Sequence, residues 1–331
     1  MILVTGATGL VGGHLLWQLM QENERVSAIR RPTSNLIPLR TIFSFYCSNP
    51  DDFLQRIDWK TADVLDFYSL VEAMNAIDIV YHCAAVVSLG NSESILLDTN
   101  VTGTRNVVQA AVEKNIKKFC FVSSIAACGK TKYSEIIDEN AVWTDSKVYS
   151  LYSKSKYYSE QEVWKGIKNG LNAVIVSPGV ILGVSGQNTG SSQLFYQVQK
   201  GLIFYTNGGS GYVDVQDVVK AMIQLVKSKI SGERFVLVGE NSSNKDVLSW
   251  MADSFGKRRP FICIGKRMML SIGYLSEIIG KLFNFSPMID LGTAKSAINR
   301  EFYSSHKIEK ALGFEFNPIE KCIKEVCDFQ K

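Results

Sequence analysis

The sequence predicts an α/β protein in which a doubly wound parallel sheet is joined to a smaller carboxyl-terminal lobe. Residues 2–4 form an unbroken apolar run, which is typical of a strand buried on both faces. This run passes into three glycines and then into apolar residues at helical spacing, and further apolar runs and helical patterns follow. At 331 residues, of which 46% are hydrophobic, the chain can bury a full core and carry one large domain with a lobe.

The glycines at positions 6, 9 and 12 predict a dinucleotide site. Gly6 allows a tight turn, Gly9 lets the backbone approach a pyrophosphate, and Gly12 lets the following helix pack close to the sheet. The phosphates would then lie at the helix N-terminus. The spacing is G-x-x-G-x-x-G, whereas the common dinucleotide fingerprint is G-x-G-x-x-G. We expect the cofactor to contact Gly6, Thr8, Gly9, Leu10, Val11 and Gly12.

The composition indicates an enzyme without a nucleic-acid partner. The chain has 36 basic and 32 acidic residues, and the net charge of +4 is too small to indicate nucleic-acid binding. The most apolar later stretch, residues 268–285, is interrupted by Glu277 and Lys281 and is too short to span a bilayer. Cys322 and Cys327 have no further Cys or His nearby, so we expect no metal site.

The cysteines predict a reducing compartment. There are seven of them at irregular spacing, and Cys83, Cys120 and Cys128 fall inside or beside expected core strands, which favours reduced thiols. The chain begins directly with a core strand, so we expect no signal peptide. Together these features predict a cytoplasmic protein.

Short apolar runs predict the remaining strands of the sheet, at residues 25–29, 60–66, 78–81, 117–123, 172–176 and 234–238. Asp66 is expected to cap a helix that reaches Met74, and longer helical patterns cover residues 93–115, 244–255 and 268–285. Residues 42–47 fit a short strand, and residues 51–57 fit a short helix. Residues 201–209 fit a hairpin-like loop between the two lobes.

The second strand ends in Arg30-Arg31-Pro32, which bears on the choice of cofactor. In dinucleotide folds an acidic residue here binds the 2′-hydroxyl of the adenosine ribose, whereas an arginine accepts a 2′-phosphate. Arg30 therefore favours NADP over NAD. The alternative is that both arginines simply face solvent at the end of a strand.

Ser124, Tyr152 and Lys156 form a candidate catalytic set. Tyr152 and Lys156 are four residues apart on an expected helix, so they share a face and can meet the same cofactor. A free tyrosine has a pKa of about 10, and a neighbouring cation favours its phenolate. Ser123 and Ser124 follow the fifth strand at the edge where such sheets place their chemistry, and Ser124 could hold a substrate oxygen. Tyr149, Tyr157 and Tyr158 lack a lysine at the same spacing.

These motifs resemble the extended branch of the short-chain dehydrogenase/reductase superfamily, the NAD-dependent epimerase/dehydratase family, and within it the dihydroflavonol reductases and 3β-hydroxysteroid dehydrogenases. The glycine turn follows Thr5, His82-Cys83-Ala84-Ala85 resembles the family's H-x-A-A turn, and residues 100–104 match its N-x-x-G-T pattern. Tyr152 and Lys156 match its Y-x-x-x-K pair. The resemblance covers nearly the whole chain, with the densest motifs in the first 220 residues.

The resemblance implies further roles for individual residues. Asn100 would order backbone and a water in a proton relay, and Lys156 would hold the nicotinamide ribose. Asp63 would bind the adenine amino group, and Val64 would pack on the adenine ring. The remaining cofactor contacts would come from Cys83, Ala84, Ala85, Ser123, Pro178, Gly179 and Val180, although Ser177 replaces the arginine that usually precedes this proline.

Four other features have a structural and a functional interpretation. His82 closes a buried strand and is better explained as a hydrogen-bonding core residue than as a catalytic one. Asp214 and Asp217 are better explained as a helix cap and a fastening between the lobes. The apolar segment 268–285 fits a substrate pocket, a partner face or ordinary core packing.

The sequence thus predicts a Rossmann-type domain from residues 1–177 and about 211–239, with residues 178–210 and 240–331 forming a smaller substrate-binding lobe. The expected activity is NADP-dependent reduction of a ketone or aldehyde, in which Tyr152 exchanges the proton. One alternative is a nucleotide-sugar epimerase that retains NAD and binds the diphosphate with Lys257, Arg258 and Arg259. Another is a non-catalytic NADP-binding protein. The family habit implies a homodimer and a small-molecule substrate.

Overall fold

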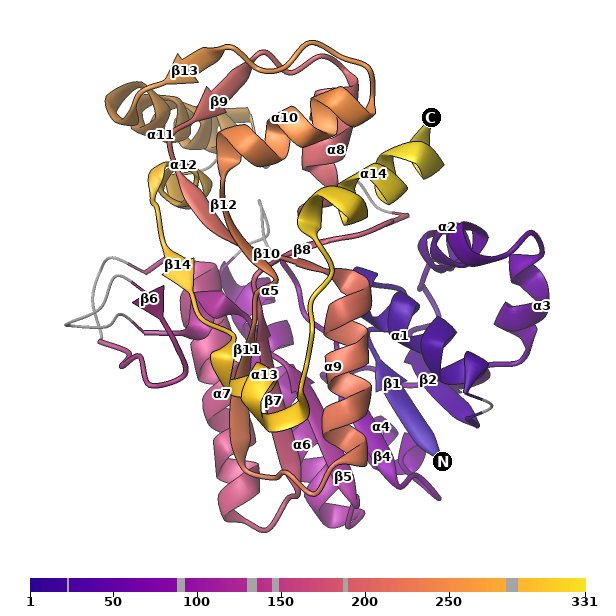
Figure 1. Cartoon of the computed structure of the whole chain (residues 1–331). Coiled ribbons are helices and arrows are strands. Elements are labelled where there is room, and N and C mark those ends of the chain that lie inside the picture. Colours follow the sequence, from indigo (N-terminus) through magenta and orange to yellow (C-terminus); the bar gives the residue numbers. More distant parts are fainter. Residues whose placement is uncertain (23, 88–92, 130–135, 145–148, 187–189, 284–290) are drawn as a thin grey trace.

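The chain is described by a computed structural model that covers every residue except 23, 88–92, 130–135, 145–148, 187–189 and 284–290 (Figure 1). Its centre is a seven-stranded sheet made of β1 (Ile2–Thr5), β2 (Val26–Arg30), β3 (Asp58–Thr61), β4 (Ile79–His82), β5 (Lys118–Val122), β7 (Ala173–Pro178) and β11 (Glu233–Leu237). The spatial order is β11-β7-β5-β4-β1-β2-β3, and all neighbouring strands are parallel. The predicted doubly wound parallel sheet is confirmed.

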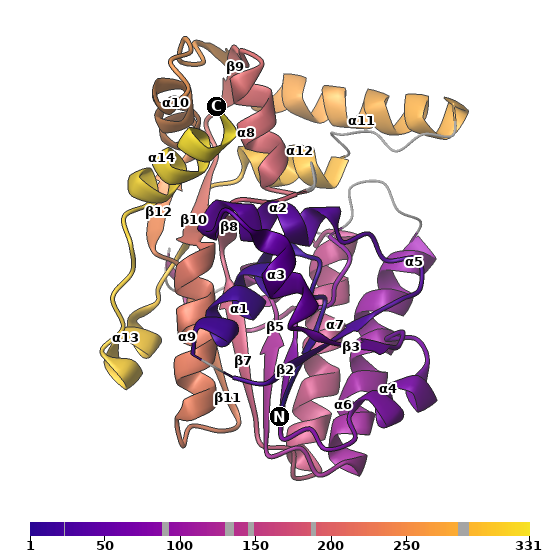
Figure 2. The same ribbon diagram turned by 90° about the vertical axis from the view of Figure 1, so that its right-hand side faces the viewer.

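Helices cover both faces of this sheet, as Figures 1 and 2 show. On one face, α1 (Leu10–Gln21), α2 (Ile37–Tyr46) and α9 (Val215–Lys227) enclose one hydrophobic core with the strands. On the other face, α4 (Phe67–Ala73), α6 (Gly103–Glu113) and α7 (Leu151–Lys168) enclose a second core. Burial on both sides explains why the inner strands β1, β5 and β7 are mostly apolar runs without alternation, whereas the edge strand β3 is polar and partly exposed.

Residues 93–113, between β4 and β5, form one helical run with an irregular turn. It consists of α5 (Glu93–Leu97), a π-helical turn η1 (Asp98–Thr102) and α6. The predicted helix over residues 93–115 is therefore present, but the π turn was not predicted. A π turn carries no periodicity signal of its own, because one extra residue only rotates the side chains that follow it.

Residues 42–46 belong to helix α2 and Cys47 is its C-cap, so the short strand expected at residues 42–47 is wrong. Leu39, Ile42 and Phe43 lie three and four residues apart and are fully buried against the core around α1. The short helix expected nearby is confirmed by α3 (Pro50–Gln55). Asp66 caps α4 as predicted, since its carboxylate accepts hydrogen bonds from the backbone N–H groups of Tyr68 and Ser69.

The remaining elements lie mainly beyond the carboxyl ends of the parallel strands (Figure 1). Strands β8 (Val180–Leu182), β10 (Gly209–Asp214) and β12 (Glu240–Ser243) form one small sheet, and two strand pairs join β9 (Phe204–Thr206) to β13 (Ile262–Ile264) and β6 (Ile136–Ile137) to β14 (Phe302–Tyr303). The hairpin-like loop expected at residues 201–209 is wrong, because β9 pairs in parallel with the distant β13.

The other helical segments pack on these small sheets, on the parallel sheet or on one another. They are η2 (Ile125–Ala127, a 3₁₀ turn), α8 (Ser192–Gln199), α10 (Asn244–Ser254), α11 (Lys266–Phe283), α12 (Leu291–Ile298), α13 (His306–Leu312) and α14 (Ile319–Gln330). Helices α8, α10 and α14 share a third hydrophobic core with β8 and β10. In the part of the chain that the structure describes, no helix is long and apolar enough to cross a membrane.

Asp214 and Asp217 have the structural roles that the sequence favoured. Asp214 caps α9 and accepts a hydrogen bond from the backbone N–H of Gln216 at 2.9 Å. Asp217 accepts hydrogen bonds from the backbone N–H and the side-chain amide of Asn317 at 2.7 and 2.9 Å. Asn317 lies two residues before α14, so Asp217 connects the start of that helix to α9.

Candidate active site

A cleft of about 690 Å³ opens at the carboxyl edge of the sheet, beside the β1–β4 pair at which the strand order reverses. Open α/β sheets bind ligands at such a point because the loops of the two neighbouring strands diverge there. Most of the residues that the sequence singled out line this cleft: Gly6, Gly9, Leu10, Val11, Gly12, Cys83, Ala85, Ser123, Ser124, Tyr152, Lys156, Pro178, Gly179 and Val180.

The glycine turn brings three backbone segments into direct contact. Gly6 has a φ of +68°, and a Cβ on it would lie 2.5 Å from the backbone nitrogen of Ala84. A Cβ on Gly12 would lie 2.3 Å from the carbonyl oxygen of Gly6. Gly9 is the N-cap of α1 and provides no side-chain acceptor for the first backbone N–H groups of the helix. The N-terminus of α1 is therefore suited to an anion.

His82 is buried outside the cleft lining and is not placed for chemistry. Its Nδ1 lies 2.7 Å from the hydroxyl of Thr5, and its Nε2 lies 3.0 Å from the hydroxyl of Thr104. Burial, with a smaller effect of the Lys156 charge, lowers the pKa of His82 to about 3. The Thr5 hydroxyl also accepts a hydrogen bond from the backbone N–H of Ala84 at 3.2 Å. The structural interpretation of His82 is confirmed.

Tyr152 and Lys156 project from successive turns of α7 into the cleft, where Ser124 follows β5. Burial raises the pKa of Tyr152, and a hydrogen bond with the Ser124 side chain opposes that rise. The Lys156 ammonium donates a hydrogen bond to the carbonyl oxygen of Val122 at 2.8 Å and lies 4.8 Å from the centre of the Phe121 ring. The three predicted catalytic side chains are thus brought together.

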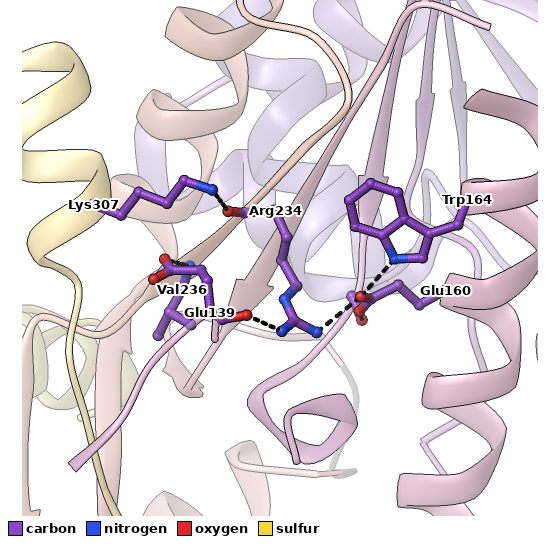
Figure 3. A network of polar contacts seen from close by, with 7 residues as sticks. Glu139, Glu160, Trp164, Arg234, Val236 and Lys307 are labelled. Atoms are coloured by element: carbon purple, nitrogen blue, oxygen red, sulfur yellow. Dashed lines mark hydrogen bonds and ion pairs between the residues drawn. The ribbon is translucent and has the colours of Figure 1, made fainter. Parts of the chain in front are cut away.

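Burial lowers the pKa of Lys156 to about 8, and the nearby carboxylate of Glu160 opposes this change. Glu160 is one turn further along α7 and is almost fully buried. Figure 3 shows its partners: its carboxylate accepts hydrogen bonds from Arg234 at 3.0 Å and from the Trp164 indole at 3.1 Å. Its second oxygen accepts a hydrogen bond from Ser123 at 2.8 Å. Sequence reasoning missed Glu160, although it follows Lys156 at the same spacing as Lys156 follows Tyr152.

Asn100 lies in the π turn and outside the cleft lining. Its side-chain oxygen accepts a hydrogen bond from the backbone N–H of Val86 at 2.7 Å, and its amide donates to the Val86 carbonyl and to Ser155, each at 3.0 Å. Ser159 donates a hydrogen bond to the backbone carbonyl of Asn100 at 2.6 Å. Asn100 therefore holds the backbone at Val86, which lines the cleft, against the helix that carries Tyr152.

Residues 2–239 match the model of the NAD dependent epimerase/dehydratase family. The chain belongs to this family. It is 27% identical to a Synechocystis sp. protein provisionally named dihydroflavonol 4-reductase, with 97% of this chain and 92% of that protein aligned. It is 26% identical to cinnamoyl-CoA reductase 1 of Petunia hybrida, with 98% and 90% aligned.

Solved structures share this epimerase/dehydratase fold over almost the full length. The crystal structure of gox2253 has a TM-score of 0.81 and 26% identity, and the match covers 99% of this chain and 97% of the other. UDP-glucose 4-epimerase from Thermotoga maritima has a TM-score of 0.77 at 17% identity, and the match covers 99% and 98%. At that identity the second similarity concerns the fold alone.

Other expected site residues of this epimerase/dehydratase chain lie outside the cleft lining: Thr8, Arg30, Asp63, Val64, Ala84 and Asn100. The Arg30 guanidinium lies 5.2 Å from the centre of the Trp59 ring. Asp63 accepts a hydrogen bond from the backbone N–H of Leu65 at 3.0 Å, and Val64 packs in the core beside Gly103. Ser177, which replaces the usual arginine, is fully buried, and its hydroxyl has no hydrogen-bond partner among the described residues.

The far end of the cleft is mostly polar, which sequence reasoning missed. Its lining there comes from β10, α8, α12 and β14 and includes Ser191, Ser192, Ser210, Ser296, Asn299, Glu301 and Tyr303. These residues are spread over more than a hundred positions and follow no common period, so only the tertiary fold brings them together. The cleft lining in this lobe contains no residue of the apolar segment 268–285 among those described.

The basic run that could bind a diphosphate in the epimerase alternative also lies away from the cleft lining. Lys257, Arg258 and Arg259 are exposed, Arg259 forms an ion pair with Asp253 at 2.7 Å, and Arg258 lies 4.0 Å from the centre of the Phe261 ring. The expectation that these cations bind a sugar-nucleotide diphosphate is therefore not supported by their position.

Proposed function

We propose that the chain is an NADPH-dependent reductase of a ketone or aldehyde. The observation that carries the proposal is the meeting of Ser124, Tyr152 and Lys156 in one cleft that also contains the glycine turn. The relatives with reductase names, cinnamoyl-CoA reductase among them, align over nearly the whole chain and support the same reaction class.

Each catalytic side chain has a role that its surroundings support. Ser124 binds the carbonyl oxygen of the substrate and orients it toward Tyr152, whose pKa the Ser124 side chain lowers. Tyr152 donates its phenolic proton to that oxygen as the carbonyl is reduced. Lys156 is protonated at neutral pH, since its pKa is about 8, and its charge stabilises the phenolate that Tyr152 becomes. A bound nicotinamide supplies the hydride to the carbonyl carbon.

Each part of the cofactor is assigned to residues that either line the cleft or follow the strands beside it. The backbone of residues 6–12 binds the pyrophosphate at the N-terminus of α1. Cys83, Ala84, Ala85 and Lys156 hold the nicotinamide ribose, and Pro178, Gly179 and Val180 bind the nicotinamide amide. Asp63 and Val64 hold the adenine. Arg30 binds the 2′-phosphate of NADP, and its position over Trp59 at the end of β2 keeps the guanidinium near this part of the site.

The chain divides into a cofactor-binding part and a substrate-binding part. Residues 1–177 with about 211–239 bind the cofactor, and residues 178–210 and 240–331 form the substrate lobe. Asn100 positions the backbone of the cleft and takes part in the proton relay. The protein acts on a small molecule in the cytoplasm, as a homodimer formed through the helices that carry Asn100 and Tyr152.

The first experiment is a titration of the purified protein with NADPH and NADH, preceded by a test for nucleotide that is already bound. Exchangeable binding with a preference for NADPH, followed by NADPH oxidation with ketones, aldehydes or flavonoid-like and steroid-like carbonyls, is the expected result. Tightly retained NAD together with interconversion of nucleotide sugars would instead favour the epimerase alternative. Binding without any turnover would favour a non-catalytic NADP-binding protein.

A further inference from the structure

Helix α11 presents one face of apolar side chains to solvent over residues 268–279. Met268, Tyr274, Leu275, Ile278 and Ile279 are between 38% and 59% exposed. They are spaced at three, four and seven residues, so they lie on one broad face of the helix. The opposite face is buried at Met269, Gly273 and Gly280. This is the reverse of an ordinary surface helix, whose polar face is the exposed one.

Neither the cleft nor the hydrophobic cores explain this face. The residues of α11 do not line the cleft, and those exposed on it belong to none of the buried clusters in the described chain. Figure 2 shows α11 extending along the upper edge of the molecule, above α12 and away from the parallel sheet. A set of large apolar side chains of this size on one exposed helix marks an interaction surface.

The segment that leads into α11 is strongly basic. Residues 257–267 contain Lys257, Arg258, Arg259, Lys266 and Arg267 and no acidic residue. All five are exposed, and Arg259 is ion-paired with Asp253 of the preceding helix. Phe261 and Ile262, between these cations, are 49% and 36% exposed. The same surface region therefore combines several positive charges with an exposed apolar helix face.

We propose that α11 and residues 257–267 dock on an anionic membrane surface. The apolar face of α11 would enter the boundary between head groups and acyl chains, while the cations contact lipid phosphates. The helix would lie in the plane of the bilayer, which agrees with the absence of a membrane-crossing helix among the described residues. A second copy of this chain fits less well, because two such faces would bring like charges together, whereas anionic head groups neutralise them.

Docking of α11 on a bilayer would place the cleft close to the membrane surface. Helix α11 packs on α12, and α12 contributes Ser296 to the cleft lining. Packed helices are separated by about 8–10 Å, so one helix layer would lie between the bilayer and that wall of the cleft. The inference goes beyond the proposed reductase function and does not depend on it.

The test is sedimentation of the full chain with vesicles of phosphatidylcholine alone and of phosphatidylcholine mixed with phosphatidylglycerol. We expect binding to the anionic vesicles that weakens as salt is added. Leu275→Ser with Ile279→Ser, and separately Lys266→Gln with Arg267→Gln, should each weaken binding by roughly tenfold or more. Tyr68→Ser removes an apolar side chain that is 82% exposed on α4 and should leave binding unchanged.

The variants must keep their circular dichroism spectrum and their affinity for nucleotide, since these α11 residues lie outside the cleft lining. Absence of binding to anionic vesicles, or equal binding by all variants, would overturn the proposal. Sedimentation velocity supplies a further outcome. A dimer that Leu275→Ser with Ile279→Ser dissociates, without any vesicle binding, would assign the face to a second copy of the chain and overturn the membrane assignment.

Discussion

Glu160 on α7 and Arg234 on β11 form a buried ion pair at 3.0 Å, and their side chains are only 2% and 14% exposed (Figure 3). Arg234 also donates to the backbone carbonyl of Glu139 at 2.6 Å. The pair therefore ties the edge strand of the sheet to the helix that carries Tyr152 and Lys156. Because the same carboxylate raises the pKa of Lys156, one side chain links the packing of α7 to the charge in the cleft.

Replacement of Glu160 by Gln should change both stability and the pH profile. Without the carboxylate charge the pKa of Lys156 falls further below its usual range, so the alkaline limb of kcat/KM should move to lower pH. Arg234 would also be left buried without its counter-charge, which costs about 3–5 kcal/mol of unfolding free energy. The shift of the alkaline limb is measured by pH-dependent kinetics, and the loss of unfolding free energy is measured by urea unfolding.

The matched control is Glu162→Gln. Glu162 is on the same helix and is also buried, but it pairs with Arg105 and Lys165 outside the cleft, so the alkaline limb should stay in place. Glu160→Gln combined with Arg234→Met should recover part of the stability but not the pH profile. An unchanged profile in the single variant would mean that Glu160 acts only through packing.

Tyr152→Phe should abolish turnover and leave the affinity for the cofactor within a few fold. The phenolic proton is lost while the ring is kept, and loss of a general acid costs roughly a hundredfold or more in rate. Tyr149→Phe is the control, because the Tyr149 hydroxyl is buried and has no hydrogen-bond partner in the described part of the chain. Turnover is followed by NADPH absorbance, and near-normal turnover in Tyr152→Phe would refute its assignment.

Arg30→Ala should weaken the binding of NADPH much more than that of NADH. A charged hydrogen bond to the 2′-phosphate would be lost, which corresponds to roughly tenfold to hundredfold in Kd. Arg31→Ala, at the neighbouring exposed position, should have a smaller effect. Fluorescence titration with both nucleotides gives the comparison, and an equal loss for the two would remove the argument for NADP.

The first turn of the cofactor site can be tested with two glycines of similar backbone conformation. Gly6 and Gly256 have φ values of +68° and +65°, but a Cβ on Gly256 would meet no atom within 4 Å. Gly256→Ala should therefore cost only about 1 kcal/mol of unfolding free energy. Gly6→Ala should cost clearly more and also weaken nucleotide binding, since its Cβ would clash with the backbone at Ala84. If Gly6→Ala and Gly256→Ala lost the same unfolding free energy, the loop after β4 would be able to move away from the added Cβ without a free-energy cost.

The sequence predicted most of the nucleotide-binding half because its signals are local. The run from Ile2 to Gly12 and the spacing of Tyr152 and Lys156 each identify a structural unit without help from distant residues. The ends of strands shifted by a few residues, since sequence pattern does not fix where a ladder of hydrogen bonds stops. Helix α2 was missed because its apolar residues also fit a short strand over so few positions.

Features that depend on tertiary contacts could not be predicted. The Glu160–Arg234 pair joins residues 74 positions apart, and β9 pairs with a strand more than fifty residues away. The polar end of the cleft is assembled from serines that are unremarkable in the sequence. The segment 268–285 fits a pocket, a partner face or core packing by composition, and only the exposure of its residues in the fold separates these interpretations.

The two buried histidines should make the protein sensitive to acid. Burial lowers the pKa of His14 to about 4 and that of His82 to about 3. In the unfolded chain both would titrate near 6.5, so below that pH the unfolded state binds more protons than the folded state. The unfolding free energy should therefore fall as the pH drops from about 6.5 toward 4, by about 2 kcal/mol for each histidine at pH 5.

His82→Gln isolates one of these contributions. The unfolding free energy of each chain is measured with urea at pH 7 and at pH 5. Its decrease between these two pH values should be smaller in His82→Gln than in the unmodified chain by about 2 kcal/mol. This difference does not depend on how much the substitution destabilises the protein at pH 7. The comparison between chains is needed because Asp217, whose pKa burial raises to about 6, takes up a proton in the same range when folded and acts in the opposite direction. His306 is exposed, so His306→Gln should keep the full drop. If His82→Gln showed the same decrease in unfolding free energy as the unmodified chain, His82 would have to be protonated inside the folded protein. Its burial and its hydrogen bonds with Thr5 and Thr104 oppose that protonation.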